Sequence, residues 1–388
     1  MSLIDPSNTI LQIKWPLGIA IIILVTLLVV IRKKSNLSIL YMFSVIVIVI
    51  IALIVAGNTM VRANDYDVVK FQEFIASLLT FALLLWATKE TNIDLSPFLF
   101  IGAFGVALIT IVLFFLYSID SYLYIIIYEY LYDKNTLLAS ERALTDSIGY
   151  MQIYYKTCAT IVIPLAFYWH RFIEEKTLKN KFRFFLISLI YFMGLIFTGT
   201  RANFVLAISV ILLVLCLTYV KKRRGQIAVA GVFLSCVVAV MLFLFSDFEE
   251  ASNNTKLGHL VSYAELFFAS PELLLLGEGA GTYFASQSSG VVTLTELTYF
   301  ELVRVMGVPL FLVFLAYILL PYQFSRYNAQ WAESKYYLVG YSAYLLIAGT
   351  NPLIIGSTGM IVIVSAITFT LQSGVNNSRI NRNLHDLL

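Results

Sequence analysis

Charged side chains are scarce in this chain of 388 residues: 13% of the residues are Asp, Glu, Lys or Arg, while 60% are hydrophobic. This balance excludes a soluble enzyme, whose surface needs about twice as many charges. Only three histidines and three cysteines are present, and no His, Asp or Glu cluster has the spacing of metal ligands. The cysteines lie inside apolar runs, where they are typical small buried hydrophobes. The sequence therefore predicts no required metal and no cofactor.

Nucleotide-binding motifs are also missing. Neither G-x-x-x-x-G-K-[ST] nor G-x-G-x-x-G occurs, and these glycine-rich loops are what hold the phosphates of ATP and of dinucleotides. The segment Gly277-Glu-Gly-Ala-Gly281 is glycine-rich but has no following lysine, and we interpret it as a backbone turn. We therefore expect chemistry that proceeds without ATP, and no nucleic-acid partner.

Long uncharged runs are what the sequence does contain, and about 20 residues suffice to cross a membrane as a helix. The plainest runs are Ser38–Gly57, Pro97–Ser118, Gln226–Phe245 and Pro352–Leu371. Shorter or interrupted runs are Trp15–Ile31, Phe74–Thr88, Gln152–Trp169, Phe184–Gly199, Ala202–Val220, Val305–Leu320 and Tyr336–Thr350. We predict an all-α, polytopic transmembrane helix bundle of about 11 spans, within a range of about 10 to 12, that occupies residues 1–388 as a single integral membrane domain.

Basic residues are distributed unevenly along the chain. If Arg32–Asn36 is cytoplasmic and the spans alternate, 17 of the 26 Lys and Arg residues fall in the shorter, cytoplasmic connections. The positive-inside rule then places the N-terminus outside and the C-terminus inside. Every long connection falls on the outer side, and the largest is an acidic loop over residues 246–301. No cytoplasmic connection is long enough to fold a domain, so we expect function at the outer face.

Arg201 is the most informative residue, because it is the one charge between the apolar runs Phe184–Gly199 and Ala202–Val220. These runs predict a transmembrane hairpin with a link of a few residues, which places Arg201 at the outer face, against the charge bias. It has no acidic neighbour in sequence, so an anionic ligand is one interpretation. The other is an arginine that snorkels to lipid phosphates.

A carboxylate stands where the chain re-enters the membrane after the outer loop. On a helix Glu296 and Tyr299 would share a face, whereas Glu301 and Arg304 lie three residues apart and could form a purely structural ion pair. Glu296 has no such partner within reach in the sequence. A carboxylate that is costly to desolvate suits the work of a general base, and we predict this role for Glu296.

Further outer residues are candidates for holding a doubly charged anion, since guanidinium groups bind phosphate oxygens bidentately. The substrate-binding candidates are Arg62, Arg142, Arg304, His259, Tyr299 and Glu278. Arg62 lies beside Asp65 and Asp67, so local pairing is a second interpretation of it. His259 is the one outer histidine, and it is either a structural residue or the base in place of Glu296.

Several segments resemble a known family in the order in which they occur. Thr198-Gly-Thr-Arg-Ala-Asn203, Leu276-Gly-Glu-Gly-Ala-Gly-Thr-Tyr-Phe284, Thr295-Glu-Leu-Thr-Tyr-Phe-Glu-Leu-Val-Arg304 and Asn351-Pro352 resemble motifs of the O-antigen ligase and polymerase superfamily of bacterial envelopes. The similarity covers about Arg142 to the C-terminus. Thr295-Glu296 stands where ligases have His-Asn, so the resemblance favours the polymerase branch, usually called Wzy, and leaves Glu296 to replace the histidine.

The resemblance implies a GT-C-like membrane glycosyltransferase that uses no metal. It implies polymerisation of undecaprenyl-diphosphate-linked repeat units into O-antigen at the periplasmic face of a bacterial inner membrane, with residues 246–301 as the large periplasmic loop. Arg201 matches the family arginine directly, and it would stabilise the departing diphosphate together with Arg142 or Arg304. A protein that regulates chain length is a possible partner, and membrane lipids surround the spans.

Two alternatives remain open. A lipid-linked oligosaccharide flippase or other secondary transporter has a similar set of spans and no nucleotide motor, but it predicts polar residues near the bilayer midplane and often an internal repeat. The spans here are nearly free of charge. An O-antigen ligase shares the chemistry of a polymerase and differs from it in the acceptor.

Overall fold

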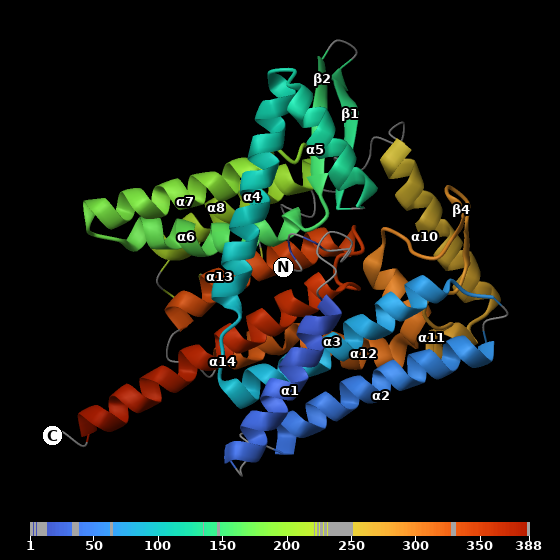
Figure 1. Ribbon diagram of the computed structural model, residues 1–388, viewed down its shortest axis with the longest axis horizontal. Coiled ribbons are helices and arrows are strands. Elements are labelled where there is room, and N and C mark those ends of the chain that lie inside the picture. Colours follow the sequence, from blue (N-terminus) through green and yellow to red (C-terminus); the bar gives the residue numbers. More distant parts are fainter. Residues whose placement is uncertain are drawn as a thin grey trace.

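The computed structural model describes residues 14–32, 39–62, 65–134, 136–145, 148–220, 251–326 and 331–385, with a few isolated positions outside these ranges. In this part of the chain the fold is mostly helical (Figure 1). The helices of the first half are α1 (Lys14–Arg32), α2 (Ile39–Arg62), α3 (Val68–Thr91), α4 (Ser96–Ser118), α5 (Tyr122–Asp133), the 3-10 helix η1 (Cys158–Ile161), α6 (Val162–Glu174) and α7 (Leu178–Ile196). Those of the second half are α8 (Arg201–Tyr219), α10 (Ala251–Ala269), α11 (Glu272–Leu276), α12 (Thr298–Arg326), α13 (Trp331–Gly349) and α14 (Ser357–His385).

Five of the described helices are long and apolar enough to cross a membrane, which makes the chain a multi-pass helical membrane protein, as the sequence predicts. They contain the segments Met42–Arg62, Val68–Thr91, Ser96–Ser118, Arg201–Tyr219 and Thr298–Ser325. The apolar parts of α1 and α14, Pro16–Ile31 and Ser357–Leu371, are shorter. The number of about 11 spans stays a prediction, and the expected span Gln226–Phe245 lies outside the described residues.

The expected span Gln152–Trp169 is wrong as a single helix. Its first residues belong to a strand, a 3-10 turn follows at Cys158–Ile161, and α6 then runs for only 13 residues. A helix of that length covers about 20 Å, less than the hydrocarbon thickness. The error has a physical cause, because a short apolar run rich in Ile and Tyr fits a buried strand as well as a helix.

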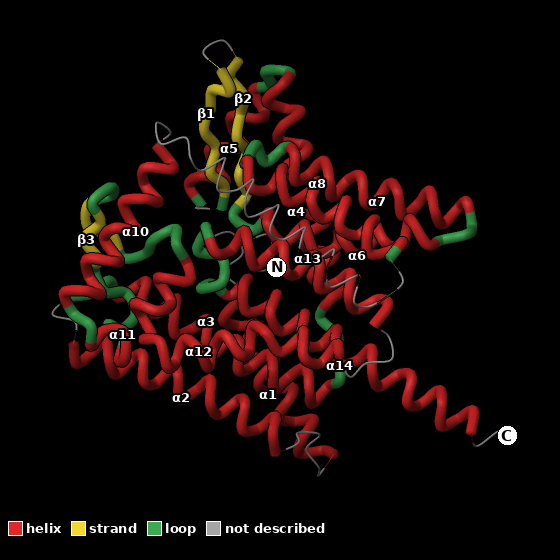
Figure 2. Tube along the Cα trace, turned by 180° about the vertical axis from the view of Figure 1, so that it is seen from behind, coloured by secondary structure: helices red, strands yellow, loops and turns green. Residues whose placement is uncertain are grey.

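The all-α prediction also needs correction, because the described chain contains two small antiparallel sheets (Figure 2). Strands β1 (Leu137–Thr145) and β2 (Ile148–Tyr155) form a hairpin in which Leu137 faces Tyr155. Strands β3 (Phe284–Ser286) and β4 (Gly290–Val292) form a shorter one in the outer loop. The segment between the expected spans Pro97–Ser118 and Gln152–Trp169 thus consists largely of α5 and the first hairpin.

The predicted hairpin of apolar helices is present as α7 and α8. α7 ends at Ile196 and α8 begins at Arg201, so that the link is as short as the sequence predicts. Both helices lie beside α6, and the three extend to the left in Figure 1 while α10, α11 and the turn between α2 and α3 lie at the right. Arg201 is therefore at the end of α8 that points toward the outer loop.

The core lies where α4, α6, α13 and α14 meet, and aromatic side chains fill much of it. Tyr337 of α13 stacks on Phe369 of α14 with 4.3 Å between ring centroids. Its hydroxyl forms a hydrogen bond of 2.9 Å with the Ser365 hydroxyl. A buried tyrosine of this kind has both its ring and its polar atom satisfied.

α12 is interrupted at Gly307, whose φ of 74° and ψ of 161° are not helical. Pro309 has no N–H to offer, so the Val305 carbonyl lacks its helical partner. This carbonyl accepts instead from the Gly279 N–H at 3.1 Å. The glycine-rich segment is a turn, as predicted, and it completes the hydrogen bonding of a broken helix.

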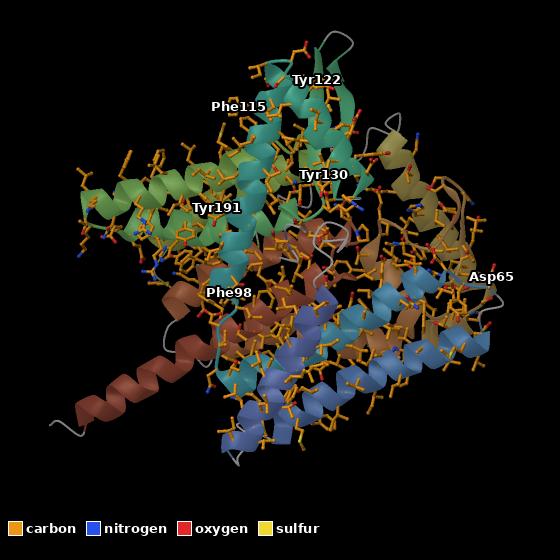
Figure 3. All side chains as sticks on the ribbon, in the orientation of Figure 1. Asp65, Phe98, Phe115, Tyr122, Tyr130 and Tyr191 are labelled. Carbon is orange, nitrogen blue, oxygen red and sulfur yellow. The ribbon has the colours of Figure 1, made fainter. Side chains whose placement is uncertain are left out.

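The same turn fastens the outer loop to the connection between α2 and α3, where Asp65 is labelled in Figure 3. The Ala280 N–H donates to Thr59 Oγ1 at 2.8 Å, and the Asp67 N–H donates to the Gly281 carbonyl at 2.9 Å. Gly279 has a φ of +97°, and a Cβ added there would lie 2.6 Å from the Thr59 Cα. This close approach of two backbones requires glycine.

Candidate active site

Arg201 is the first residue of α8 and is half-buried. Thr200 precedes it in an extended conformation, and Gly199 adopts a φ of +65°, which turns the chain between the helices. The Thr198 hydroxyl donates to the Leu195 carbonyl at 2.6 Å and closes the end of α7. The helix N-terminus adds its own positive potential to that of the guanidinium, which favours an anion here.

Asn203, two residues further along α8, joins this turn to the segment after the first β-hairpin. Its Nδ2 donates to Thr198 Oγ1 at 3.0 Å and lies 3.2 Å from Cys158 Sγ. The side chain is 1% exposed. Asn203 therefore fixes the position of the Arg201 turn relative to η1.

Glu296 lies in the loop just before α12, which begins at Thr298. The expectation that it shares a helical face with Tyr299 is therefore wrong. Its side chain is 45% exposed, and its carboxylate lies 3.6 Å from the Lys256 ammonium of α10. The sequence also predicts that this carboxylate has no partner and is desolvated. Both expectations are wrong, because the side chain is partly exposed and packing of the outer loop brings Lys256 to it from 40 residues upstream.

Tyr154, at the end of β2, interacts electrostatically with Glu296, one of the two predicted catalytic residues. Burial raises the pKa of its hydroxyl well above the usual value, and the neighbouring Cys158, Tyr344 and Glu296 raise it further. Cys158 is also the residue that contacts Asn203, two positions from Arg201. The residues that interact electrostatically with Tyr154 thus include Glu296 and also Cys158, which contacts the Arg201 turn through Asn203. We call Tyr154, Cys158, Asn203 and Tyr344 the central cluster.

A second polar group, the loop cluster, consists of Tyr263, Glu278, Glu301 and Arg304. Arg304 is completely buried, and its Nη2 lies 2.6 Å from Glu301 Oε1. Its Nη1 forms an ion pair with Glu278, and other hydrogen bonds go to oxygen atoms of Thr282. The guanidinium donors are used inside the loop, so Arg304 contributes to the loop structure, and Glu301–Arg304 is the ion pair that the spacing allowed.

Tyr263 completes the loop cluster. Its hydroxyl donates to Glu301 and lies 2.6 Å from the Thr295 hydroxyl, and its ring stacks on Phe284 with 4.6 Å between centroids. Burial, with Glu301 as the next cause, raises the pKa of this hydroxyl far above its usual value. Thr295 is the neighbour of Glu296, so the loop cluster holds the backbone that carries the predicted base.

His259 of α10 is 3% exposed, and its Nε2 lies 3.1 Å from the Ser289 hydroxyl. Its Nδ1 has no hydrogen-bond partner among the described residues. Burial lowers the pKa of His259, while Glu296 and Glu301 act in the opposite direction. The histidine is thus near the predicted base, in a position that disfavours its charged form.

The other predicted binding residues lie apart from these clusters or support them. Tyr299 donates to the Leu345 carbonyl at 2.9 Å, which joins α12 to α13. Glu278 is the partner of Arg304 in the loop cluster. Arg62 is exposed at the end of α2. Arg142 pairs with Tyr150 in the β1–β2 ladder, and its side chain lies outside the described part of the structure.

Tyr154, Cys158, Asn203 and Tyr344 were not predicted as site residues. Asn203 had a signal, since it belongs to the segment that carries Arg201. The two tyrosines had none, because tyrosine is abundant in this chain and neither lies in a motif. The pairing of Lys256 with Glu296 also had no signal in the sequence, because it depends on the fold of the loop.

Within the described residues, no group of three or more His, Cys, Asp or Glu side chains is arranged to hold a metal ion. Comparison with known proteins finds no matching family model, no matching curated protein and no matching solved structure.

Proposed function

We propose that this protein is a metal-independent glycosyltransferase that joins undecaprenyl-diphosphate-linked repeat units into O-antigen polysaccharide at the periplasmic face of a Gram-negative inner membrane. The observation that carries the proposal is that Asn203, in the turn that begins with Arg201, contacts Cys158, and that Cys158 and Glu296 both interact electrostatically with the Tyr154 hydroxyl. A cation for a diphosphate and a carboxylate for a proton are the two groups that this transfer requires.

In the proposed mechanism, Glu296 accepts the proton of the acceptor hydroxyl as the hydroxyl oxygen attacks the anomeric carbon of the donor. The bond between that carbon and the diphosphate oxygen breaks, and its electron pair leaves with the diphosphate. Arg201 neutralises the developing charge, assisted by the N-terminus of α8. One such displacement inverts the anomeric centre.

The assignment of cations differs from the one that sequence motifs favour. Arg304 is occupied within the loop cluster, so it supports the reaction through the position of Thr295 and Glu296. Lys256 is 19% exposed and next to Glu296, which makes it the cation that orients the base. We assign the diphosphate to Arg201 because it is half-buried at the N-terminus of α8, where the helix adds positive potential.

The direct test is incubation of purified protein in detergent with a synthetic undecaprenyl-diphosphate repeat unit and no nucleotide, with the glycan products separated on a gel. We expect a ladder of increasing length. Glu296→Gln and Arg201→Met should each lower the rate by about 100-fold or more, which is the usual effect of losing a general base or a charge-stabilising group.

Matched controls separate chemistry from charge. Glu272→Gln removes an exposed carboxylate of the same outer loop, and Arg183→Met removes an exposed arginine of α7. Both should leave the ladder unchanged. A full ladder from Arg201→Met would contradict the mechanism.

Two outcomes would favour the alternatives. Transfer of a finished glycan to lipid A-core, with no ladder from repeat units, would identify an O-antigen ligase. Movement of the lipid across proteoliposome membranes with no new glycosidic bond would identify a flippase, and Arg201 would then be a binding residue only.

A further inference from the structure

The connection between α6 and α7 carries a concentration of positive charge. Residues 171–183, which we call the basic link, contain five basic and two acidic side chains. The basic residues are Arg171, Lys176, Lys179, Lys181 and Arg183. Nitrogen atoms, blue in Figure 3, gather at the left ends of these two helices, and Lys176 and Lys179 are exposed.

The two acidic side chains of the basic link have local partners. Glu175 Oε1 accepts from the backbone N–H groups of Lys176 and Thr177 at 3.1 and 3.0 Å. Glu174 lies 3.2 Å from His170 Nε2. In the described part of the chain, no ion pair joins the three lysines of the link to a carboxylate. Their charge is therefore open to an anion from outside the protein.

The basic link lies at the opposite membrane face from Arg201. α8 is one of the five helices long and apolar enough to cross a membrane, and α7 packs beside it and leads into it through the Arg201 turn. α7 has 19 residues and is therefore about 28 Å long, close to the thickness of the hydrocarbon core. In the topology predicted from the basic residues, the end of α7 that carries the link is cytoplasmic.

An exposed apolar stripe begins at the basic link and follows α7 toward the interior of the membrane. It consists of Leu178, Phe182, Leu186 and Leu189, whose spacing of three or four residues places them on one face of the helix. Leu178 is 82% and Phe182 60% exposed, and the other two are exposed as well. Charge at one end of a continuous apolar surface matches the two parts of a phospholipid.

The lysines border the start of this stripe. At 100° per residue, Lys179 and Lys181 lie on either side of Leu178. The Lys181 ammonium lies 5.5 Å from the centre of the Phe172 ring of α6, a cation–π contact that holds this side chain beside the link. A phosphate at the link would thus have ammonium groups around it and apolar side chains directly below it.

We propose that the basic link and the apolar stripe bind an anionic phospholipid of the leaflet opposite Arg201. Lys176, Lys179 and Lys181 bind the phosphate, and the acyl chains lie along the stripe. The stripe is the reason to assign a lipid and not a free phosphate, which has no use for an apolar surface. The site is at the far end of α7 from Arg201, so it anchors the protein and takes no part in the proposed reaction.

The test measures lipid binding to purified protein in detergent by native mass spectrometry, with phosphatidylglycerol as the anionic lipid and phosphatidylcholine as the neutral one. The wild type should bind phosphatidylglycerol at least tenfold more tightly. In the double variant Lys176→Gln/Lys179→Gln this affinity should fall by about 20-fold, while that for phosphatidylcholine should stay the same. Both side chains are exposed, so the unfolding midpoint should not change.

The matched control is Lys70→Gln/Lys134→Gln, which removes the same charge from α3 and from the end of α5. It should keep the preference for phosphatidylglycerol. Phe182→Ser tests the stripe and should weaken binding of both lipids, because it removes apolar contact with the acyl chains. Soluble glycerol phosphate should not compete with phosphatidylglycerol at millimolar concentration.

Equal affinity of the wild type for the two lipids would overturn the proposal, as would an equal loss in the control variant, which would indicate a general effect of net charge. Competition by glycerol phosphate, or unchanged lipid binding in Phe182→Ser, would show a site for phosphate alone and would reject the lipid. None of these results bears on polymerisation, so the proposed function is tested separately.

Discussion

The loop cluster and the central cluster are both buried groups of polar side chains, yet their hydrogen bonding is opposite. In the loop cluster every donor of Arg304 has an acceptor, and two carboxylates balance its charge. In the central cluster the hydroxyls of Tyr154 and Tyr344 and the amide oxygen of Asn203 have no hydrogen-bond partner among the described residues. A satisfied buried network makes a structure rigid, whereas a buried polar group without a partner costs free energy.

The largest expected effect comes from breaking the loop cluster. Arg304→Met leaves Glu301, which is 1% exposed, as an unpaired buried carboxylate. Removal of one member of a buried ion pair costs about 3–5 kcal/mol, so the midpoint of thermal unfolding in detergent should fall by about 10 °C. Arg201→Met makes the same chemical change at a half-buried helix N-terminus and should lower the midpoint by about 2 °C or less. Equal losses in the two variants would remove the distinction between the clusters.

Docking of the outer loop can be weakened without a change of charge. Gly279→Ala places a Cβ against the Thr59 backbone at a φ of +97° and should cost about 1–3 kcal/mol. The measurement is the rate of limited proteolysis between α10 and α12, which should rise. Gly290→Ala is the control, because its φ of +68° is also positive but no atom lies within 4 Å of the added Cβ. Both substitutions place alanine at a positive φ, but only the Cβ of Gly279→Ala meets other atoms, so this variant should be cut faster than Gly290→Ala.

His259 interacts electrostatically with Glu296 and Glu301, so its titration probes the surroundings of the predicted base. Its pKa is lower in the folded protein than the usual value of about 6.5, so the unfolded chain takes up the proton first as pH falls. The stability of the wild type should therefore decline below about pH 6.5, and His259→Gln should decline less. Unfolding midpoints measured between about pH 8 and 5 test this, and parallel curves would contradict it.

The smallest effect is expected for Lys256→Met. Its ion pair with Glu296 spans 3.6 Å, and the carboxylate is 45% exposed, so water and salt screen the interaction. The unfolding midpoint should change by about 2 °C or less, whereas the polymerisation rate should fall if the ammonium orients the base. A loss of stability comparable to that of Arg304→Met would mean that Glu296 belongs to the scaffold.

Much of the helical architecture could be predicted from the sequence, because long hydrophobic runs indicate helices and a short link between two runs indicates a hairpin. The hairpin at Arg201 follows from two uncharged runs, and the turn at Gly277–Gly281 follows from three glycines that are all at positive φ. The Glu301–Arg304 pair follows from helical spacing. Each of these depends on contacts between residues near in sequence.

Features that depend on distant contacts were missed. The strand that contains Tyr154 is apolar enough to be taken for the start of a helix, and only its pairing with β1 identifies it. Lys256 reaches Glu296 because α10 folds back over the loop before α12. Unsatisfied hydroxyls have no sequence signature, since they are defined by the absence of a partner in the folded chain.

The break in α12 also determines which parts of the outer face can move separately. The first turns of α12 are bonded to the glycine-rich segment through the Arg304 and Val305 carbonyls, and that segment is bonded to α2 through Thr59. These hydrogen bonds join the first turns of α12, the glycine-rich segment and α2, and the break at Gly307 separates them from the remainder of α12. A change of angle between the two parts of α12 at Gly307 would move Glu296 relative to Arg201, which belongs to α8.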